Sequence, residues 1–255
     1  MLITASEIIK NSWETYSKNW KRILPYMILL FVTSATLGII GIAGLQIESI
    51  LGKGNLVLLN NLVVAALDVA LLLFTLWTTI ALIKNLRNIV ENKDMVELKE
   101  TFRQTSKYLW PVVWTSFLMG LAIVGGFVLL LIPAIIFAIW FTYSFYTVIF
   151  EDKKGIEALK SSRSLVVGRW WKTFWLILAP SIFYGIIIAA LQGAITLPLE
   201  AIFGKETLTF IFTNSILTTI VSALFAPLSA LTTLYLYLNV KANPITKIPE
   251  IPNKI

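Results

Sequence analysis

Few residues in this sequence could do chemistry, because the side chains that most often act as bases, nucleophiles and metal ligands are missing. The 255 residues include no histidine and no cysteine. Their absence excludes thiol nucleophiles, disulfides and thiolate metal sites, and it removes the commonest general base. The acidic pair Glu151-Asp152 stands beside Lys153-Lys154 at the end of an apolar segment, where we expect a solvated charge cluster rather than a metal site. The sequence therefore predicts no enzyme active site, cofactor or metal.

Asp68 is the one ionisable residue well inside a long apolar segment. A charge at such a depth costs about 2.5–3.5 kcal/mol on insertion scales, so it usually faces a bundle interior or water and is a functional candidate. One interpretation is a group that carries a proton or cation. The other, which we favour, is a protonated or hydrogen-bonded acid joined to Thr, Asn or Gln on a neighbouring span. With Asp68 we group Asn61, Gln192 and Asn214 as a candidate intramembrane polar site, although such amides more often join helices than bind ligands.

The segments that must position these residues are strongly apolar. The chain is 57% hydrophobic and 14% charged, whereas a soluble domain carries about 25% charged residues. Segments long enough to cross a bilayer, which takes about 20 residues, occupy residues 23–45, 56–83, 109–150, 173–197 and 208–240. The third is long enough for two helices joined by a tight turn, with break signals at Gly125-Gly126 and a second helix starting near Pro133. We therefore predict an all-α integral membrane protein with six transmembrane helices, since helices satisfy their own backbone hydrogen bonds.

The positively charged residues predict the orientation of the chain. Of the 21 lysines and arginines, all but Lys53 and Lys205 fall on one side of the expected spans: in the N-terminal segment, between spans two and three, between spans four and five, and after span six. Positive residues concentrate on the cytoplasmic side of membrane proteins. We expect a multi-pass protein of the cytoplasmic membrane with both termini in the cytoplasm.

Three related segments, each ahead of a pair of apolar spans, indicate an internal repeat. EIIKNSWETYSKNW (7–20) and EALKSSRSLVVGRW (157–170) share a glutamate, a lysine, a serine and a tryptophan at the same spacing, and LKETFRQTSKYLW (98–110) is a looser copy. A single domain, 1–255, would then consist of three units, each an amphipathic helix followed by a transmembrane hairpin. The expected units are residues 5–84, 94–150 and 155–240, followed by a short tail at 241–255.

The repeated segments have the pattern of amphipathic helices. In the first copy, Ile9, Trp13, Tyr16 and Trp20 fall on one helical face, and the corresponding face of the second copy begins at Met95. Such helices lie in the headgroup plane with basic side chains toward anionic lipid; alternatively they cover the cytoplasmic ends of the bundle, and both can hold. The expected interface anchors are Trp13, Trp20, Trp110, Trp170 and Trp171. The expected basic interface residues are Lys10, Lys160, Arg163, Arg169 and Lys172.

The segment from Glu151 to Trp171 resembles a recurring signature of six-span bacterial and archaeal membrane proteins. The residues that carry the resemblance are Glu151, Gly155, Ala158-Leu159-Lys160, Ser162, Leu165-Val166, Gly168 and Trp170-Trp171. These proteins include the membrane domain that precedes the catalytic barrel of some glycerophosphodiester phosphodiesterases, and uncharacterised stand-alone relatives. The resemblance implies a fold and a membrane location. It does not imply phosphodiesterase chemistry, because that active site uses histidines and metal-binding carboxylates on a soluble barrel.

Two functions fit these observations best. The first is a non-catalytic membrane scaffold or a lipid- or protein-interaction module, with the lipid bilayer and its anionic headgroups as partner. A membrane-protein partner or a homo-oligomer is also compatible, whereas the thinly spread charge of +7 argues against nucleic acid. The alternative is a transporter or channel for a small solute or lipid, with Asp68 as its intramembrane polar site.

Overall fold

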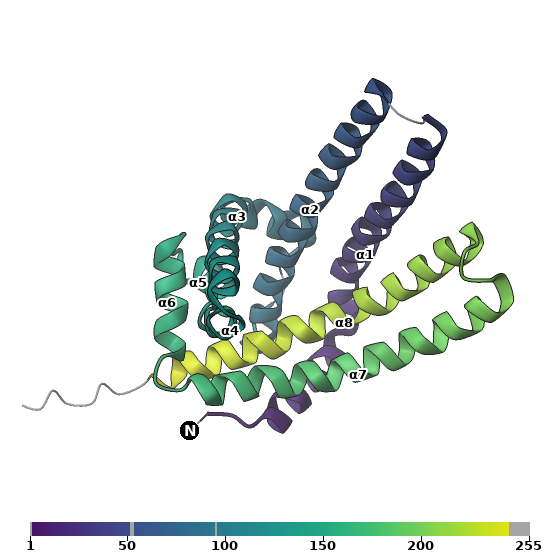
Figure 1. Ribbon diagram of the computed structural model, residues 1–255. Helices are drawn as coiled ribbons and strands as arrows, with labels where there is room; N and C mark the ends of the chain where they lie inside the picture. The colour runs from purple at the N-terminus through teal and green to yellow at the C-terminus, as the bar shows by residue number, and fades with distance from the viewer. Residues whose placement is uncertain (1, 52–53, 95, 245–255) are drawn as a thin grey trace, which may run out of the picture. The chain divides into compact units, whose positions relative to one another are not determined.

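A computed structural model describes residues 2–51, 54–94 and 96–244, and within them every regular element is a helix (Figure 1). The helices are α1 (Ala5–Leu51), α2 (Asn55–Val90), α3 (Leu98–Leu129), α4 (Leu131–Trp140), α5 (Ser144–Glu151), α6 (Ile156–Val166), α7 (Trp170–Phe203) and α8 (Leu208–Ala242). Six segments are long and apolar enough to cross a membrane: α1, α2, α3, α4 together with α5, α7, and α8. The expected all-helical fold with six such segments is confirmed. Lys53, Met95 and residues 245–255 of the expected tail lie outside the described residues.

The chain forms two compact units, each assembled from separate stretches of sequence. The first unit contains Met1–Lys10, Trp110–Pro180 and Thr232–Ile255, and the second contains Asn11–Leu109 and Ser181–Leu231. Helices α1, α3, α7 and α8 contribute residues to both units. Neither unit coincides with one of the three expected repeats.

The amphipathic stretches of the first two copies are not separate helices. α1 runs without interruption from residues 7–20 into the apolar residues 23–45, and α3 likewise continues from residues 98–110 into its apolar part. In the third copy a break does separate the two parts, because α6 ends at Val166 and α7 begins at Trp170. The difference lies in Gly168, whose φ of 88° ends the helix. The corresponding junctions of α1 and α3 contain no glycine.

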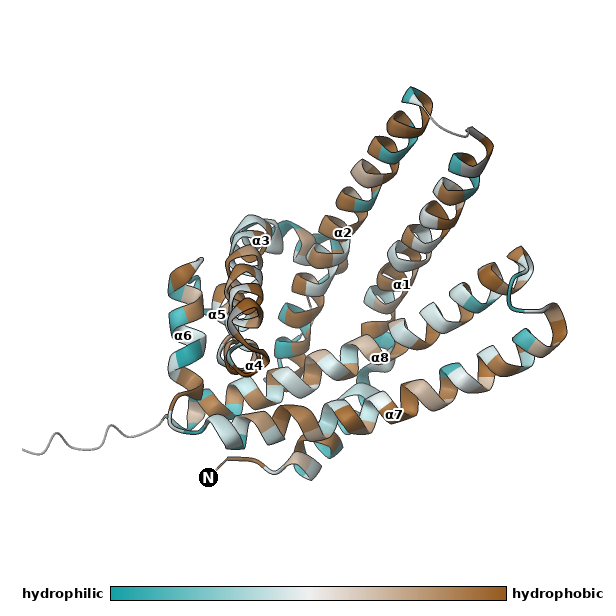
Figure 2. Cartoon of the chain, in the orientation of Figure 1, coloured by the Kyte–Doolittle hydropathy of each residue, from teal (hydrophilic) through white to brown (hydrophobic). Residues whose placement is uncertain are grey.

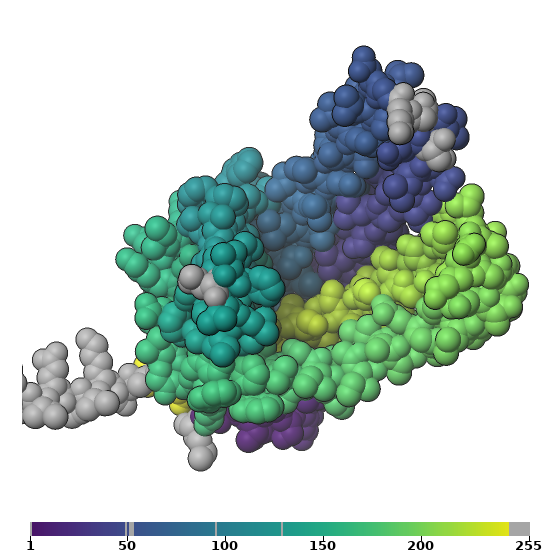
Figure 3. All heavy atoms as spheres, viewed as in Figure 1, coloured from purple at the N-terminus to yellow at the C-terminus, as the bar shows by residue number. Residues whose placement is uncertain are grey.

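The second unit is built from two helical hairpins. α1 lies beside α2, and α7 lies beside α8 (Figures 1 and 3). Its core includes Ile23, Tyr26, Ile80 and Leu82, all at most 2% exposed. Several polar side chains within these hairpins, among them Asn60, Gln192 and Asn214, bridge neighbouring helices.

Much of the apolar surface of α2 is not covered by the protein. Apolar residues recur along the whole helix (Figure 2), and in its first half Leu56, Leu62 and Leu72 are 63%, 69% and 57% exposed. A helix that is apolar around its whole circumference is found in a protein core or in a membrane. The described residues leave these leucines exposed, so they do not enclose this part of α2 in a protein core.

In the first unit, the fourth apolar segment is broken into two helices. We expected one helix from near Pro133 to residue 150; instead α4 ends at Trp140, residues 141–143 form a turn, and α5 begins at Ser144. The expected tight turn before it is confirmed, because α3 ends at Leu129 and α4 begins at Leu131. Gly126 is not at this turn but inside α3. A Cβ there would lie 2.9 Å from the Ala134 nitrogen, so the glycine permits α3 and α4 to approach closely.

Candidate functional site

Helix α6, within the segment from Glu151 to Trp171, holds the broken helix in place. The Ser162 hydroxyl donates to the Trp140 carbonyl oxygen at 2.7 Å and accepts from the Tyr143 N–H at 3.0 Å. The Thr147 hydroxyl donates to the Ala158 carbonyl oxygen at 3.2 Å. Ser162, Tyr143, Thr147 and Ala158 are all 0% exposed. Since a helix break leaves backbone groups without partners, a serine at this position satisfies one donor and one acceptor that would otherwise be buried and unpaired.

Gly155 fixes the start of α6 against α3. Its N–H donates to the Thr115 hydroxyl at 2.9 Å, and its φ is 52°. A Cβ at this position would lie 3.1 Å from Trp114 Cδ1 and 3.2 Å from Nε1. The position therefore requires glycine for two reasons, backbone conformation and space.

Glu151 joins α5, α6 and α8 through its carboxylate. Oε1 accepts from the Tyr237 hydroxyl at 2.8 Å and from Lys241 Nζ at 3.0 Å. Oε2 lies 2.7 Å from Lys153 Nζ and accepts from the Ser161 hydroxyl at 3.1 Å. The Glu151 side chain is 13% exposed, so our expectation of a solvated charge cluster is wrong for this residue. It failed because Tyr237 and Lys241 are remote in sequence and cannot be paired with Glu151 from local spacing.

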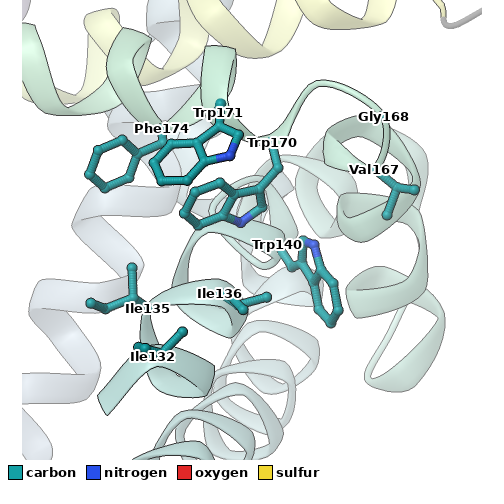
Figure 4. Close-up of a pocket in the computed structure, with 9 residues that line it drawn as sticks. All are labelled: Ile132, Ile135, Ile136, Trp140, Val167, Gly168, Trp170, Trp171 and Phe174. Carbon is teal, nitrogen blue, oxygen red and sulfur yellow. The ribbon is translucent and has the colours of Figure 1, made fainter.

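An apolar groove of about 740 Å³ lies beside this motif, between α4 and the start of α7 (Figure 4). Ile132, Ile135 and Ile136 of α4 line one side, and Trp170, Trp171 and Phe174 of α7 line the other. Trp140 and the turn residues Val167 and Gly168 complete the lining. The Trp170 and Phe174 rings stack with centroids 5.4 Å apart, and the Trp171 ring meets Trp170 edge-on at 4.8 Å. The aromatic wall is therefore a packed cluster rather than three independent side chains.

Two arginines stand at the groove. The Arg163 guanidinium lies over the Trp140 ring, 4.4 Å from its centroid, a cation–π contact. Arg169 immediately precedes Trp170; its Nη1 donates to the Asn243 carbonyl oxygen at 2.7 Å. Burial lowers the pKa of the Arg169 guanidinium, and the nearby Tyr143 opposes that shift. An arginine side chain remains protonated in proteins, so Arg163 and Arg169 are both positively charged.

Buried hydrogen-bond donors without a partner occur at the break between α4 and α5 and at the start of α7. Six buried side-chain polar atoms of the described residues have no hydrogen-bond partner, and five of them belong to Tyr143, Ser144, Arg169, Trp170 and Thr173. All five atoms, three hydroxyls, the Arg169 Nε and the Trp170 Nε1, can donate. An unsatisfied buried donor costs about 1–3 kcal/mol. Arg169 Nε and Trp170 Nε1 are the donors of this set at the start of α7, so positive charge and unpartnered donors occur together there among the described residues.

The candidate intramembrane polar residues lie in the second unit and are not gathered into one site. Gln192 Nε2 donates to the Thr218 carbonyl oxygen at 3.3 Å and to the Ser222 hydroxyl at 3.2 Å. Asn214 Oδ1 accepts from the Thr196 hydroxyl at 2.7 Å. These bonds join α7 to α8, as expected of amides between helices.

Asp68 and Asn61 lie on α2 and take no part in the hydrogen bonds between α7 and α8. Asn61 Oδ1 accepts from Asn60 Nδ2 at 3.3 Å, and the same Nδ2 lies 3.3 Å from the Gly44 carbonyl oxygen of α1. Asp68 Oδ1 is buried without a hydrogen-bond partner. The hydrogen bond that we expected from Asp68 to a neighbouring Thr, Asn or Gln is therefore not found among the described residues.

The expected interface anchors are largely exposed. Trp13, Trp20, Trp110 and Trp171 are 46–71% exposed, whereas Trp170 is half-buried in the groove. Trp114 and Trp175, which we did not single out, are exposed to a similar degree. Among the expected basic residues, Lys10, Lys160 and Lys172 are exposed, as is Arg163, and Arg169 is partly buried.

Sequence reasoning missed the buried amide of Asn85, which organises the second unit. Its Nδ2 donates to the Tyr26 hydroxyl, to the Thr101 hydroxyl at 2.9 Å and to the Val96 carbonyl oxygen at 3.2 Å, and its Oδ1 accepts from the Val96 N–H. These bonds join α1, α2, α3 and the connection between α2 and α3. Asn85 sits next to Lys84 in a positively charged stretch, so the sequence gives it the appearance of a loop residue. No cluster of three metal-ligating side chains occurs in the part of the chain that the structure describes.

Comparison with known proteins identifies a family but no characterised relative. We found no significant match among curated proteins or among solved structures. Residues 100–239, more than half of the chain, match a family described as a domain of unknown function, DUF7847. The matched region includes α6, the groove and the hairpin of α7 and α8. The chain belongs to the DUF7847 family.

Proposed function

We propose that the protein is a multi-pass protein of the cytoplasmic membrane with both termini in the cytoplasm. The six long apolar helices and the uncovered apolar surface of α2 support insertion. The concentration of lysine and arginine on one side of the spans supports the orientation. On this arrangement the α6 motif and the groove lie near the cytoplasmic headgroups.

The orientation is testable because the chain has no native cysteine. Glu206→Cys lies between α7 and α8 and Lys154→Cys between α5 and α6, and both positions are exposed. An impermeant thiol reagent added to intact cells should label Glu206→Cys, and it should label Lys154→Cys only after lysis. Labelling of Lys154→Cys in intact cells would overturn the orientation.

Within that membrane, the role that we propose is a non-catalytic module that organises lipid or a membrane partner. The observation that carries this proposal is the set of exposed tryptophans beside exposed lysines and arginines, such as Trp20 with Lys21 and Trp171 with Lys172. Tryptophan favours the membrane–water interface, and clustered basic residues favour anionic lipid. We also propose that the three-unit organisation is shared with the membrane domain of the glycerophosphodiester phosphodiesterases, without their chemistry.

The lipid-organising role can be measured in reconstituted vesicles. Bromine atoms placed near the lipid headgroups should quench tryptophan fluorescence more than bromines placed at the ends of the acyl chains. Replacing zwitterionic lipid by anionic lipid should raise the thermal stability of the protein. Equal quenching at both depths together with no response to anionic lipid would defeat the proposal.

A transporter or channel is the alternative, and one observation favours it. Asp68 Oδ1 is buried in α2 without a hydrogen-bond partner, as would suit a carboxyl group that binds a proton or cation in passing. Against this, Gln192 and Asn214 make hydrogen bonds between α7 and α8 and are not gathered with Asp68. A flux assay on vesicles containing the wild-type protein and Asp68→Asn separates the two functions.

A further inference from the structure

The groove of the first unit has two chemically different parts. One part is apolar, formed by isoleucines of α4 and aromatic rings of α7. The other is positively charged: Arg163 of α6 lies over the Trp140 ring, and Arg169 precedes α7, where Arg169 Nε and Trp170 Nε1 are buried donors without a hydrogen-bond partner. Trp170 belongs to both, because its ring lines the groove and its N–H has no acceptor. A ligand that fills such a site needs an apolar body and an anionic end.

We propose that this groove binds one anionic phospholipid, with an acyl chain against Ile132, Ile135 and Trp170 and the phosphate at Arg163 and Arg169. The inference deepens the proposed lipid-organising function and rests on it.

Charge complementarity selects an anionic occupant. The two segments that form the groove, residues 131–150 and 163–180, contain three basic residues, Arg163, Arg169 and Lys172, and no acidic residue. The nearest acid in sequence, Glu151, accepts from Lys153, Lys241, Tyr237 and Ser161, so it is already neutralised. Guanidinium groups bind phosphate through paired, charge-assisted hydrogen bonds. A zwitterionic lipid brings a cation together with its phosphate, so it would leave the positive charge of this segment only partly compensated.

The apolar part selects a lipid over a free anion. A volume of about 740 Å³ falls within the range of roughly 300–1,000 Å³ typical of small-molecule sites. Its aliphatic side is solvent-facing in the described chain, since Ile132 is 68% and Ile135 is 40% exposed. An acyl chain would cover that surface, whereas inorganic phosphate would leave it exposed and gain nothing from it.

Native mass spectrometry of the full chain, purified in neutral detergent and stripped of lipid, tests this proposal. The probes are dioleoyl-phosphatidylglycerol, dioleoyl-phosphatidylcholine and inorganic phosphate. We expect one tightly retained phosphatidylglycerol and no retained phosphate. Phosphatidylcholine should bind roughly tenfold more weakly, because its choline cation would lie beside the two arginines and be repelled by them.

Two variants address the two parts of the site, each with a matched control. Ile135→Trp fills the apolar part, and its control is Ile186→Trp at an exposed position of α7 outside the groove. Arg163→Gln removes a guanidinium, and its control is Lys154→Gln at an exposed position between α5 and α6. Ile135→Trp and Arg163→Gln should each weaken phosphatidylglycerol binding roughly tenfold, and the controls should bind as the wild type does.

Each contrary result has one meaning. If phosphatidylglycerol binds the wild type but both groove variants retain it fully, the groove is not the site, while the lipid-organising function stands. Equal retention of phosphatidylcholine would refute anion selection, and binding of phosphate alone would refute the acyl contribution. If no lipid is retained and the vesicle experiments also show no response to anionic lipid, the proposed function itself fails. Thermal unfolding of each variant identifies a folding defect, and Arg163, being exposed, provides the second variant should Ile135→Trp misfold.

Discussion

The hydroxyl of Ser162 donates to the carbonyl oxygen of Trp140 at 2.7 Å, which ties α6 to the end of α4. The Ser162 hydroxyl also accepts from the Tyr143 N–H on the far side of the break. One side chain thus closes both ends of an interruption in an apolar helix. The aromatic side of the groove depends on this contact, because Trp140 lines the groove and the turn after α6 leads directly to Trp170.

The first prediction is that Ser162→Ala destabilises the protein. The change leaves the Trp140 carbonyl and the Tyr143 N–H buried and unpaired, and we expect a loss of about 1–3 kcal/mol in the free energy of unfolding. The control is Ser164→Ala on the same helix, because Ser164 is exposed and its hydroxyl bonds only to the Ser161 carbonyl within its own helix. Denaturant unfolding in detergent measures both. Equal stability of the two variants would show that Ser162 does not hold the break.

Gly155 and Gly120 should respond in opposite directions to alanine. Gly155→Ala places a Cβ 3.1 Å from Trp114 at a φ of 52°, and we expect a loss of about 1–3 kcal/mol. Gly120 lies inside α3, and a Cβ there would meet no atom within 4 Å. Gly120→Ala should therefore stabilise the helix by up to about 1 kcal/mol. Thermal unfolding of the two variants checks the sign of each effect, and a neutral Gly155→Ala would contradict the description of α6.

Glu151→Gln should weaken the junction of α5, α6 and α8. The amide keeps one acceptor but loses the charge that two lysines contact at 2.7 and 3.0 Å. Hydrogen bonds to charged groups are worth about 1.5–3 kcal/mol, and a loss in that range is expected. Glu157→Gln is the control, because Glu157 is exposed on α6. Hydrogen exchange should show faster opening near Tyr237 in Glu151→Gln alone; unchanged exchange there would mean that the carboxylate does not organise the junction.

The architecture followed from the sequence, whereas the contacts that build the site did not. Apolar segment length predicted six helices, since the cost of an unpaired backbone in lipid leaves few alternatives. The break at residues 141–143 was not visible, because Phe141, Thr142 and Tyr143 include no charge, glycine or proline. Its hydrogen-bond partner, Ser162, lies on another helix. The partners of Glu151 were missed for the same reason. Only one side of the groove could be anticipated from the sequence. Trp170 and Trp171 were predicted to be interface anchors, but their spacing does not predict a contact with the isoleucines of α4.

Acid should remove a stabilising contribution from Glu91, at the end of α2. Hydrogen bonds from Lys93 and Arg87, both 2.6 Å long, lower the pKa of Glu91. A carboxyl group whose folded pKa lies below its unfolded value contributes stability above the unfolded pKa and loses it as the pH falls through the folded pKa. We therefore expect the stability of the wild type to fall below about pH 4 more steeply than that of Glu91→Gln. Parallel acid limbs in the two proteins would show that Glu91 contributes nothing.

The last prediction concerns Asp68, whose Oδ1 is buried in α2 without a partner. An unpaired buried polar group costs free energy, and replacing it by an apolar side chain of similar size is neutral or stabilising. Asp68→Leu should therefore unfold at the same temperature as the wild type or higher, and Asp68→Asn should be tolerated.

A flux measurement on Asp68→Asn distinguishes a structural Asp68 from one that carries a proton or cation. If Asp68 is structural, Asp68→Asn leaves vesicle flux and lipid binding unchanged. If it carries a proton or cation, Asn cannot change its charge, and a well-folded Asp68→Asn protein should lose flux while it still binds phosphatidylglycerol. We expect no such loss. Gln192 and Asn214 are the amides that could extend a pathway from Asp68, and both already make hydrogen bonds between α7 and α8. A folded variant without flux would make transport the first function of this protein.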